Sequence, residues 1–203
     1  MWLMETDADS GGTDLLDEFA YVARALAEHG WCVANAGNLS QLMRDGTIIV
    51  TGAGTTMAEV AVDPGRALVQ IDAEGEKLAG YYEPSSEVLA HLLTYEAVRE
   101  SRPHITALVH THSPALLVWA SLDPRPELPK GKLPEGGIAV NPYFPPGTRE
   151  LADACAEAAA EGASLIVWEK HGVIALARTL TAGLEMIEAA EDLAQAAVYA
   201  DEA

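Results

Sequence analysis

The chain has 203 residues, of which 49% are hydrophobic, and this length and composition are typical of a globular protein with a sizeable core. No apolar run is long enough to cross a bilayer, and the acidic start, MWLMETDADSGGTD, lacks the basic and apolar regions of a signal peptide. The two cysteines, Cys32 and Cys155, give no disulfide framework, so we expect a reduced, cytoplasmic protein.

The formal net charge of −19 excludes some classes of partner. Nucleic acid and anionic lipid both require clustered Lys and Arg, so we expect this chain to bind neither. Two explanations of the charge stay open: an ordinary acidic, soluble surface, or adaptation to a high internal salt concentration.

Apolar periodicity and turn residues predict alternating helices and strands, with no internal repeat and no linker, so we expect one domain over residues 1–203. Strands are expected at 38–43, 47–51, 67–71, 105–110, 164–169 and 173–177. Helices are expected from Thr13 to about residue 29, from Pro84, from Pro114 to about Leu122, from Thr148 to about Glu161, and from Thr181 nearly to the end. The proline-rich segment 123–146 is expected to be mostly loop.

These elements favour an α/β protein whose sheet is mainly antiparallel. Asp45-Gly46 between two predicted strands is a strong hairpin signal, and hairpins join antiparallel strands. No Gly-x-Gly-x-x-Gly follows a strand, which excludes a Rossmann dinucleotide site.

The segment Val109-His110-Thr111-His112 suggests a metal site. Residues i and i+2 of a strand point to the same side, so the imidazoles of His110 and His112 can chelate one cation. His171 precedes Gly172 in a tight turn between two buried strands and can supply a third ligand. Three protein ligands with an open fourth position are typical of a catalytic zinc site. The alternative is three packed or exposed histidines, and that is how we interpret His29 (helix end), His91 (helix face) and His104 (loop).

Two kinds of segment suggest anion binding. Pro84-Ser85-Ser86-Glu87 is expected to begin a helix whose apolar face is Val88, Leu92 and Tyr95, and free N–H groups at a helix start bind anions. The loops 36–40 and 51–54 combine glycine N–H groups with hydroxyl or amide side chains, which can cradle a phosphate without lysine. The alternatives are an ordinary helix start and ordinary turns.

Taken together, these motifs resemble one known family. Gly-Asn-x-Ser, Thr-Gly-x-Gly, Pro-Ser-Ser-Glu, His-x-His, Pro-Gly-Thr and Lys-His-Gly occur in the order and spacing of the class II aldolase/adducin family, from about residue 13 to 200. Segments 37–40 and 49–54 resemble L-rhamnulose-1-phosphate aldolases, and segment 84–87 resembles L-fuculose-1-phosphate aldolases. The resemblance implies a three-layer fold with a central, mainly antiparallel sheet flanked by helices, and a homotetramer with active sites at subunit boundaries.

The resemblance also implies residue roles. His110, His112 and His171 would ligate Zn²⁺, with another divalent transition metal as the alternative. Glu87 would be the acid/base and would touch the metal when substrate is absent. The phosphate of a small sugar phosphate would be held by Asn38, Thr51, Gly52, Ser85 and Ser86, with Gly37 shaping the loop.

Two departures from the family pattern concern tyrosines. The fuculose enzyme places a tyrosine from a neighbouring subunit at a site comparable to residues 129–133, where this chain has none. The chain also ends at Ala203, so we expect the C-terminal tail that carries another family tyrosine to be absent. Tyr143 is the nearest replacement by sequence, with packing under a proline loop as the alternative interpretation.

The implied activity is that of a zinc-dependent aldehyde-lyase, which reversibly cleaves a ketose 1-phosphate to dihydroxyacetone phosphate and an aldehyde. Zinc would polarise the C2 carbonyl and Glu87 would protonate C3 of the enediolate. Dehydration, decarboxylation or 4-epimerisation of another sugar phosphate stay open, as does a non-catalytic, adducin-like interaction domain.

Overall fold

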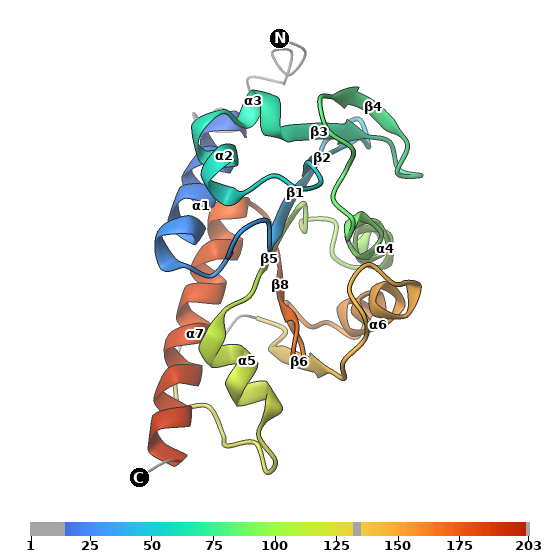
Figure 1. Ribbon diagram of the computed structural model, residues 1–203. Helices are drawn as coiled ribbons and strands as arrows, with labels where there is room; N and C mark the ends of the chain where they lie inside the picture. Colours follow the sequence, from blue (N-terminus) through green and yellow to red (C-terminus); the bar gives the residue numbers. More distant parts are fainter. Residues whose placement is uncertain (1–14, 132–134, 202–203) are drawn as a thin grey trace.

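The centre of the fold is an eight-stranded sheet, seen in a computed structural model that describes residues 15–131 and 135–201 (Figure 1). The strand order is β4-β3-β2-β1-β5-β8-β7-β6. The strands are β1 (Asn38–Leu42), β2 (Ile48–Thr51), β3 (Leu68–Ile71), β4 (Lys77–Gly80), β5 (Ala107–Thr111), β6 (Ile138–Asn141), β7 (Leu165–Trp168) and β8 (Gly172–Ala177). All neighbouring strands are antiparallel except β6 and β7, which confirms the predicted α/β fold with a mainly antiparallel sheet.

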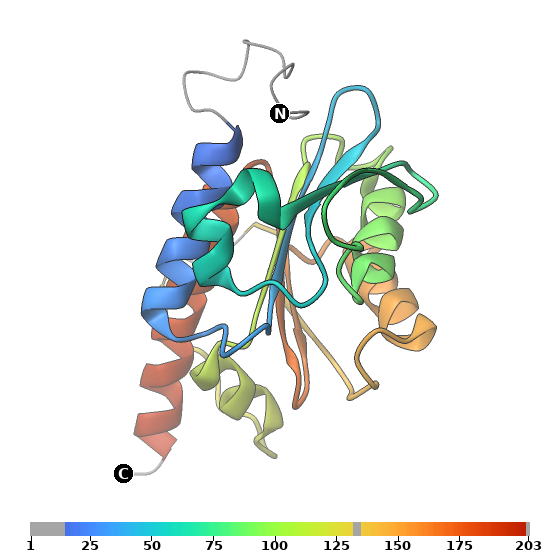
Figure 2. The same cartoon turned by 45° about the horizontal axis from the view of Figure 1, so that its top comes forward.

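Helices cover both faces of the sheet, as the two views in Figures 1 and 2 show. They are α1 (Leu15–His29), α2 (Met57–Val62), α3 (Pro64–Ala67), α4 (Val88–Val98), α5 (Pro114–Ser121), α6 (Arg149–Ala160) and α7 (Leu180–Asp201). One apolar cluster joins the sheet to α1, α2, α5 and α7, and a second joins it to α4 and α6. None of the described helices combines the length and apolar character needed to cross a membrane.

The alternation of side chains along β5 decides where the site lies. Ala107 and Val109 belong to the cluster under α1 and α7, whereas Leu108 belongs to the cluster under α4 and α6. Because successive side chains of a strand point to opposite faces, His110 shares the face of Leu108. The first histidine of His-x-His is therefore directed toward the α4 side of the sheet.

Several local signals place element ends where the sequence predicted them. Gly30 ends α1 with φ +71°, and Gly46 makes the β1–β2 turn with φ +87°, a backbone region that glycine adopts without strain. Asp45 Oδ1 accepts a hydrogen bond of 2.9 Å from Thr47 N in the same turn. The hydroxyl of Thr148 caps α6 by accepting from Leu151 N. Thr13, the predicted cap of α1, lies outside the described residues.

The predicted start of α4 at Pro84 is wrong. The helix begins at Val88, and Glu87 is its N-cap residue, with φ −101° and ψ 10°. Pro84 instead forms an isolated antiparallel bridge with Gly52, and Ser85 N donates to Thr51 O at 3.1 Å. Pairing with the end of β2 thus overrides the local helix signal and delays the first turn.

The predicted apolar face of α4 is correct only in part. Tyr95 is buried, but Val88 and Leu92 are only partly buried. The buried face is instead Ala90, His91, Thr94, Tyr95 and Val98. A polar group therefore lies on the side of α4 that faces the sheet.

The sequence also missed elements in segments assigned to loops. The segment 123–146 contains β6, a half-buried strand of four residues that pairs in parallel with β7. Helix α2 has a capping box between Thr56 and Glu59, so its Thr-x-x-Glu pattern was a usable signal. Helix α3 begins with Asp63 as its side-chain cap and Pro64 in its first turn, which was also a usable signal, whereas the short strand β4 had none.

Candidate active site

Three histidines from two elements converge at one end of the sheet. His110 lies near the end of β5, His112 follows directly after this strand, and His171 lies in the turn between β7 and β8. Their ligand atoms all lie within 4.8 Å of one another. The ring of His110 is 5.1 Å from that of His112 and 5.2 Å from that of His171. The structure therefore brings together the three residues predicted to bind metal, in a group that could hold one ion.

The β7–β8 turn is shaped to bring His171 close to the strand histidines. Lys170 adopts φ +59°, and His171 N donates to Trp168 O at 3.1 Å, which closes the turn. A Cβ added at Gly172 would lie 2.4 Å from His110 Cε1. Glycine is therefore required there, because any larger residue would displace the His110 imidazole.

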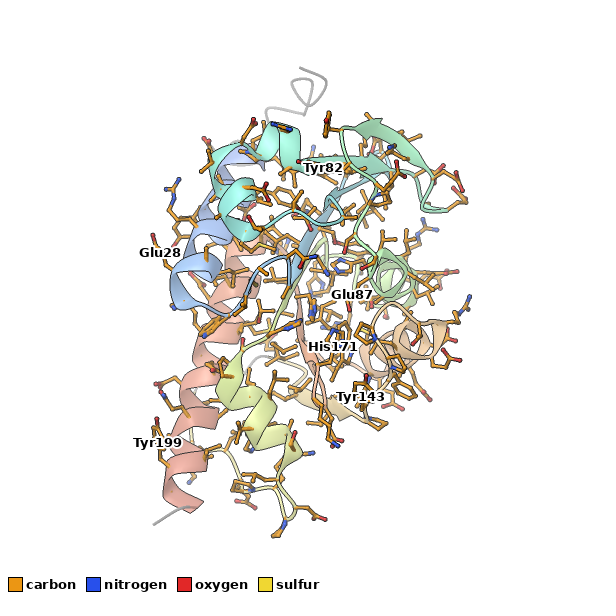
Figure 3. All side chains as sticks on the ribbon, viewed as in Figure 1. Glu28, Tyr82, Glu87, Tyr143, His171 and Tyr199 are labelled. Atoms are coloured by element: carbon orange, nitrogen blue, oxygen red, sulfur yellow. The ribbon has the colours of Figure 1, made fainter. Side chains whose placement is uncertain are left out.

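The carboxylate of Glu87 lies among these imidazoles (Figure 3). Its Oε2 is 3.1 Å from His110 Nε2, and its Oε1 is 3.0 Å from His171 Nε2. His110 Nδ1 is 3.0 Å from the backbone oxygen of Val173, which only accepts, so Nδ1 must carry a proton. In the neutral ring Nε2 then bears a lone pair directed at the carboxylate.

That arrangement fits a bound cation. His110 Nε2 and Glu87 Oε1 are buried and lack a hydrogen bond of good geometry, although they lie in ion-pairing range of partners. A lone pair facing a carboxylate is repulsive unless a proton or a metal ion lies between them. A divalent cation would give these orphaned atoms a partner.

Electrostatics also favour an ionised Glu87 carboxylate and a neutral His112 ring. Burial alone would raise the pKa of Glu87, but the charges and hydrogen bonds of His110 and His171 hold it well below its usual range. Burial, aided by the charges of His110 and His171, lowers the pKa of His112 to about 4. Neutral imidazole and ionised carboxylate are the protonation states that ligate metal.

Asn38 links this group to the neighbouring strand. Asn38 is paired with His110 across the β1–β5 ladder, and its Nδ2 donates to Glu87 Oε2 at 2.9 Å. Its Oδ1 lies against the ring of His91, which is 1% exposed. His91, interpreted from the sequence as an ordinary helix-face residue, is thus in contact with the candidate site. The other two histidines interpreted this way, His29 and His104, are exposed.

A cleft of about 200 Å³ opens beside Glu87. Its lining includes all six residues predicted to surround the phosphate: Gly37, Asn38, Thr51, Gly52, Ser85 and Ser86. Two of the histidines, His112 and His171, also line it.

Two groups of residues make up this site. We call the segments 36–38, 51–55 and 85–86 the anion loops, and we call His110, His112, His171 and Glu87 the metal corner. None of the described lining residues is Lys or Arg.

The anion loops offer neutral donors. Thr51 Oγ1 accepts from Leu39 N at 3.3 Å, and Ser85 Oγ accepts from Glu87 N at 3.3 Å. Because each hydroxyl already accepts a backbone N–H, its own O–H is available to donate to a ligand. Hydroxyl and amide donors around a concave loop bind anions without a cationic side chain.

Glycines let the backbone approach closely in these loops. A Cβ added at Gly37 would lie 2.5 Å from Cys32 Sγ and 2.8 Å from His110 O. One added at Gly52 would lie 2.6 Å from Tyr82 Cβ. Both positions are therefore closed to larger residues, and at Gly37 the anion loop packs directly against the backbone of His110.

Some lining residues had been assigned no role from the sequence. Ala36, Ala53 and Gly54 lie within the two predicted phosphate loops, and Asn35 and Thr55 directly adjoin these loops. Pro146 lines the cleft from a distant loop; it belongs to the Pro-Gly-Thr motif of the family resemblance, but no contact with the site was predicted for it. Tyr143, the suggested replacement for the family tyrosine, is half exposed and is not among the described lining residues.

A larger cavity of about 500 Å³ lies next to the β7–β8 turn but contains none of the predicted site residues. Its charged lining is balanced between Arg125 and Lys170 on one side and Asp123 and Glu169 on the other. Arg125 is already engaged by Ala120 O at 2.6 Å and lies 3.5 Å from Glu169. We therefore place the candidate active site in the smaller cleft, where the polar groups converge.

Comparison with known proteins agrees with this architecture. Residues 17–198 match the family model described as class II aldolase and adducin N-terminal domain. The 3-oxo-tetronate 4-phosphate decarboxylase of Escherichia coli (strain K12) is 32% identical over 188 residues, covering 89% of this chain and 84% of that protein. The L-fuculose phosphate aldolase of Methanococcus vannielii is 30% identical over 182 residues, covering 89% of this chain and 93% of that protein.

A solved structure shares the fold over nearly the whole chain. The sugar-phosphate aldolase from Thermotoga maritima superposes with a TM-score of 0.77 at 26% identity, covering 91% of this chain and 94% of that one. The sheet order, the histidine group and the family match therefore agree. The chain belongs to the class II aldolase and adducin N-terminal domain family.

Proposed function

We propose that this protein is a metal-dependent aldehyde-lyase that reversibly cleaves a ketose 1-phosphate to dihydroxyacetone phosphate and an aldehyde. The observation that carries the proposal is the contact of the Glu87 carboxylate with His110 and His171 in the cleft that the anion loops line. A small phosphorylated ketone can therefore reach a cation, an acid/base and phosphate donors at once.

The metal corner would hold Zn²⁺ through His110, His112 and His171, and another divalent transition metal would suit the same ligands. When bound, the cation supplies Lewis-acid polarisation of the substrate carbonyl. His110 is held for this role by its Nδ1–H bond to Val173 O, which leaves Nε2 free as the ligand atom.

Glu87 would move the proton at C3. In cleavage the C4 hydroxyl gives up its proton as the C3–C4 bond breaks and the aldehyde leaves, the electron pair of that bond passes to the C2 carbonyl, and Glu87 passes a proton on to C3. In synthesis ionised Glu87 removes the same proton. The hydrogen bond from Asn38 Nδ2 orients the carboxylate, and its burial keeps competing water away.

The anion loops would hold the phosphate. Thr51, Ser85 and Ser86 offer hydroxyl donors, and Asn38 adds its side-chain NH₂ group. Gly52 lines the cleft, where its missing side chain leaves room for the phosphate, while its own N–H donates to Ala67 O at 2.8 Å. Gly37 shapes the loop beneath them. Because the described lining is free of Lys and Arg, the bound cation would provide most of the attraction for the substrate's charge.

The test is proton exchange. Zinc-loaded protein is incubated with dihydroxyacetone phosphate in heavy water, and loss of one C3 proton is followed by NMR. We expect stereospecific exchange that a chelator abolishes and that Glu87→Gln slows at least ~100-fold, the usual worth of a positioned acid/base. Near-normal exchange in a zinc-containing Glu87→Gln variant would contradict the role of Glu87.

A second candidate reaction is decarboxylation of a 3-oxo-tetronate 4-phosphate, and the 32% identical relatives favour it. Loss of CO₂ from such a 3-oxo acid leaves the enediolate of dihydroxyacetone phosphate, which is the species that the aldolase reaction also forms. CO₂ leaves without needing a proton, so a site with one acid/base and no tyrosine among its described lining residues suits this reaction.

Product analysis separates the two reactions. Both predict proton exchange into dihydroxyacetone phosphate, because both protonate the same carbon. An aldolase also condenses dihydroxyacetone phosphate with an aldehyde to give a ketose 1-phosphate. A decarboxylase releases CO₂ from the oxo acid and forms no such product when supplied with L-lactaldehyde or glycolaldehyde.

We further propose that the protein acts as a single domain in a cytoplasmic homotetramer, as the family resemblance implies. Light scattering of the purified protein tests the tetramer, for which a mass four times that of the 21.5 kDa chain is expected. A monomer of full activity would contradict the proposed placement of active sites at subunit boundaries.

A further inference from the structure

A buried polar chain leads away from Glu87 into the α4 side of the sheet. His91 lies one turn after Glu87 on α4, and its two ring nitrogens are both engaged. Nδ1 is 2.7 Å from Ser40 Oγ, and Nε2 is 2.5 Å from Asn38 Oδ1. Ser40 is fully buried, and its hydroxyl is also 2.9 Å from Tyr95 Oη. Apolar packing alone would not require four polar side chains to contact one another in a buried series, as Asn38, His91, Ser40 and Tyr95 do.

The charge of Glu87 and the neutral ring of His91 together fix the directions of the hydrogen bonds from Glu87 to Ser40. An ionised carboxylate only accepts, so the amide of Asn38 must present its NH₂ group to Glu87 Oε2, at 2.9 Å. Asn38 Oδ1 then faces His91 Nε2 and can only accept, so Nε2 carries the proton. Burial lowers the pKa of His91 to about 3, so the ring is neutral and its Nδ1 must accept from Ser40.

The opposite orientation of the Asn38 amide is disfavoured by Glu87. If the amide turned by 180°, its Oδ1 would face the ionised Glu87 carboxylate, and two acceptors in contact repel each other. Unsatisfied buried polar groups of this kind are costly. His91 adds to the preference, because its Nε2–H can donate to Asn38 Oδ1 only while the NH₂ group faces Glu87.

That orientation serves the cleft as well. Asn38 lines the cleft, and its NH₂ group has two hydrogens, of which Glu87 accepts one. The other hydrogen is available to an anion in the cleft. The Asn38 amide, whose oxygen contacts His91, therefore donates to Glu87 and can also donate to an anion bound by the anion loops.

We propose that His91 is a positioning residue which, as the Nε2-protonated tautomer donating to Asn38, orients the Asn38 amide toward both Glu87 and the bound phosphate. The expected effect of His91 on catalysis rests on the proposed function. The expected tautomer of His91 and the orientation of Asn38 do not depend on that function. Misorientation of a group that positions an acid/base costs about 10- to 100-fold in rate.

The first test is the tautomer. Nitrogen-15 NMR of histidine-labelled protein distinguishes a protonated from an unprotonated ring nitrogen. We expect His91 to show protonated Nε2 and unprotonated Nδ1, with or without zinc. Protonated Nδ1 would overturn the inference whatever the enzyme catalyses, so this result is separate from the fate of the proposed function.

The second test compares variants of zinc-loaded protein. His91→Leu removes both hydrogen bonds at similar volume, whereas His91→Gln retains a donor for Asn38. We expect His91→Leu to keep its zinc, to lower kcat for dihydroxyacetone phosphate exchange at least tenfold and to raise KM severalfold. His91→Gln is expected to recover most of kcat, and wild-type kcat in folded His91→Leu would overturn the inference.

A matched control separates positioning from stability. Thr94 is also fully buried on α4, but its Oγ1 contacts Cys155 Sγ at 3.3 Å on the side of α6. Thr94→Val is expected to lower stability without changing kcat, and an equal loss of kcat there would overturn the inference. If His91→Leu fails to fold, Ser40→Ala replaces it, and unchanged kcat and tautomer in that variant would be equally contradictory.

Discussion

The metal corner and the anion loops share one cleft but differ in how they are built. The histidines of the metal corner come from a central strand and a tight turn, and their positions follow from strand register and close packing. The anion loops lie at strand ends and offer hydroxyl groups and the Asn38 amide, without a cationic side chain among the described lining residues. A substitution in the metal corner should therefore abolish catalysis, whereas a substitution in the anion loops should mainly weaken substrate binding.

The largest expected effect tests the metal corner directly. The His110→Ala, His112→Ala double variant removes two of three proposed ligands, so we expect loss of stoichiometric zinc and of all measurable proton exchange. Metal analysis after dialysis measures the first, and NMR the second. His104→Ala, in an exposed loop, is the control and should keep both. A full zinc content in the double variant would refute the site.

Gly172→Ala tests whether close packing fixes the metal corner. The new Cβ would lie 2.4 Å from His110 Cε1 and 2.6 Å from Thr111 O, so the imidazole must move. We expect destabilisation of about 1–3 kcal/mol and a 10- to 100-fold loss of zinc affinity. Urea unfolding and zinc titration measure these effects.

Gly65→Ala is the matched control for this glycine. Its Cβ would meet only Asp63 Oδ1, at an ordinary 3.7 Å, so little change is expected. Equal zinc affinity in Gly172→Ala and the wild type would mean that the turn does not set the position of His110.

Ser86→Ala tests the anion loops. Ser86 is exposed at the cleft, so its removal should leave the fold intact and remove one donor to the phosphate. We expect KM to rise about 5- to 10-fold with little change in kcat, because one hydrogen bond of uniform binding is lost. Ser121→Ala lies outside this cleft and should change neither constant. A fall in kcat at constant KM would place Ser86 in the chemical step instead.

The smallest expected effect concerns pH. Burial lowers the pKa of His91 from 6.5 to about 3 in the folded protein, so the unfolded chain binds a proton more readily. Stability is therefore lost as the pH falls from about 6.5, with a slope approaching ~1.4 kcal/mol per pH unit from this residue. Urea unfolding of metal-free protein between about pH 5 and 6.5 should show a shallower slope in His91→Gln. Identical slopes would mean that His91 is not buried in its neutral form.

The two parts of the site also differed in how far the sequence predicted them. Strand periodicity was enough to place His110 and His112 on one side of a strand, and the structure brings both to His171. The same local reasoning was wrong about Pro84, because pairing with Gly52 across the sheet decides where α4 begins. The anion loops were recognised through family motifs, since each glycine loop alone indicates only a turn.

The features that the sequence did not predict depend on contacts between residues far apart in the chain. No sequence pattern distinguishes His91 from other helix residues. Its proposed role depends on contacts with Asn38 and Ser40 of β1, which are 53 and 51 residues away in the sequence. Pro146 lines the cleft from a loop that has no apolar periodicity. Strand β6 has only four half-buried residues, so its pattern could not be recognised within the surrounding proline-rich segment. Such features follow from tertiary packing, which a local pattern does not encode.

One measurement tests most directly the claim that the two regions act on one substrate. Crystals grown with zinc and phosphoglycolohydroxamate, a hydroxamate analogue of the enediolate, would be measured at the zinc absorption edge. The account predicts one anomalous peak among His110, His112 and His171, with the phosphate on Thr51, Ser85 and Ser86. A metal peak elsewhere, or a phosphate bound at Arg125 and Lys170 in the larger cavity, would contradict it.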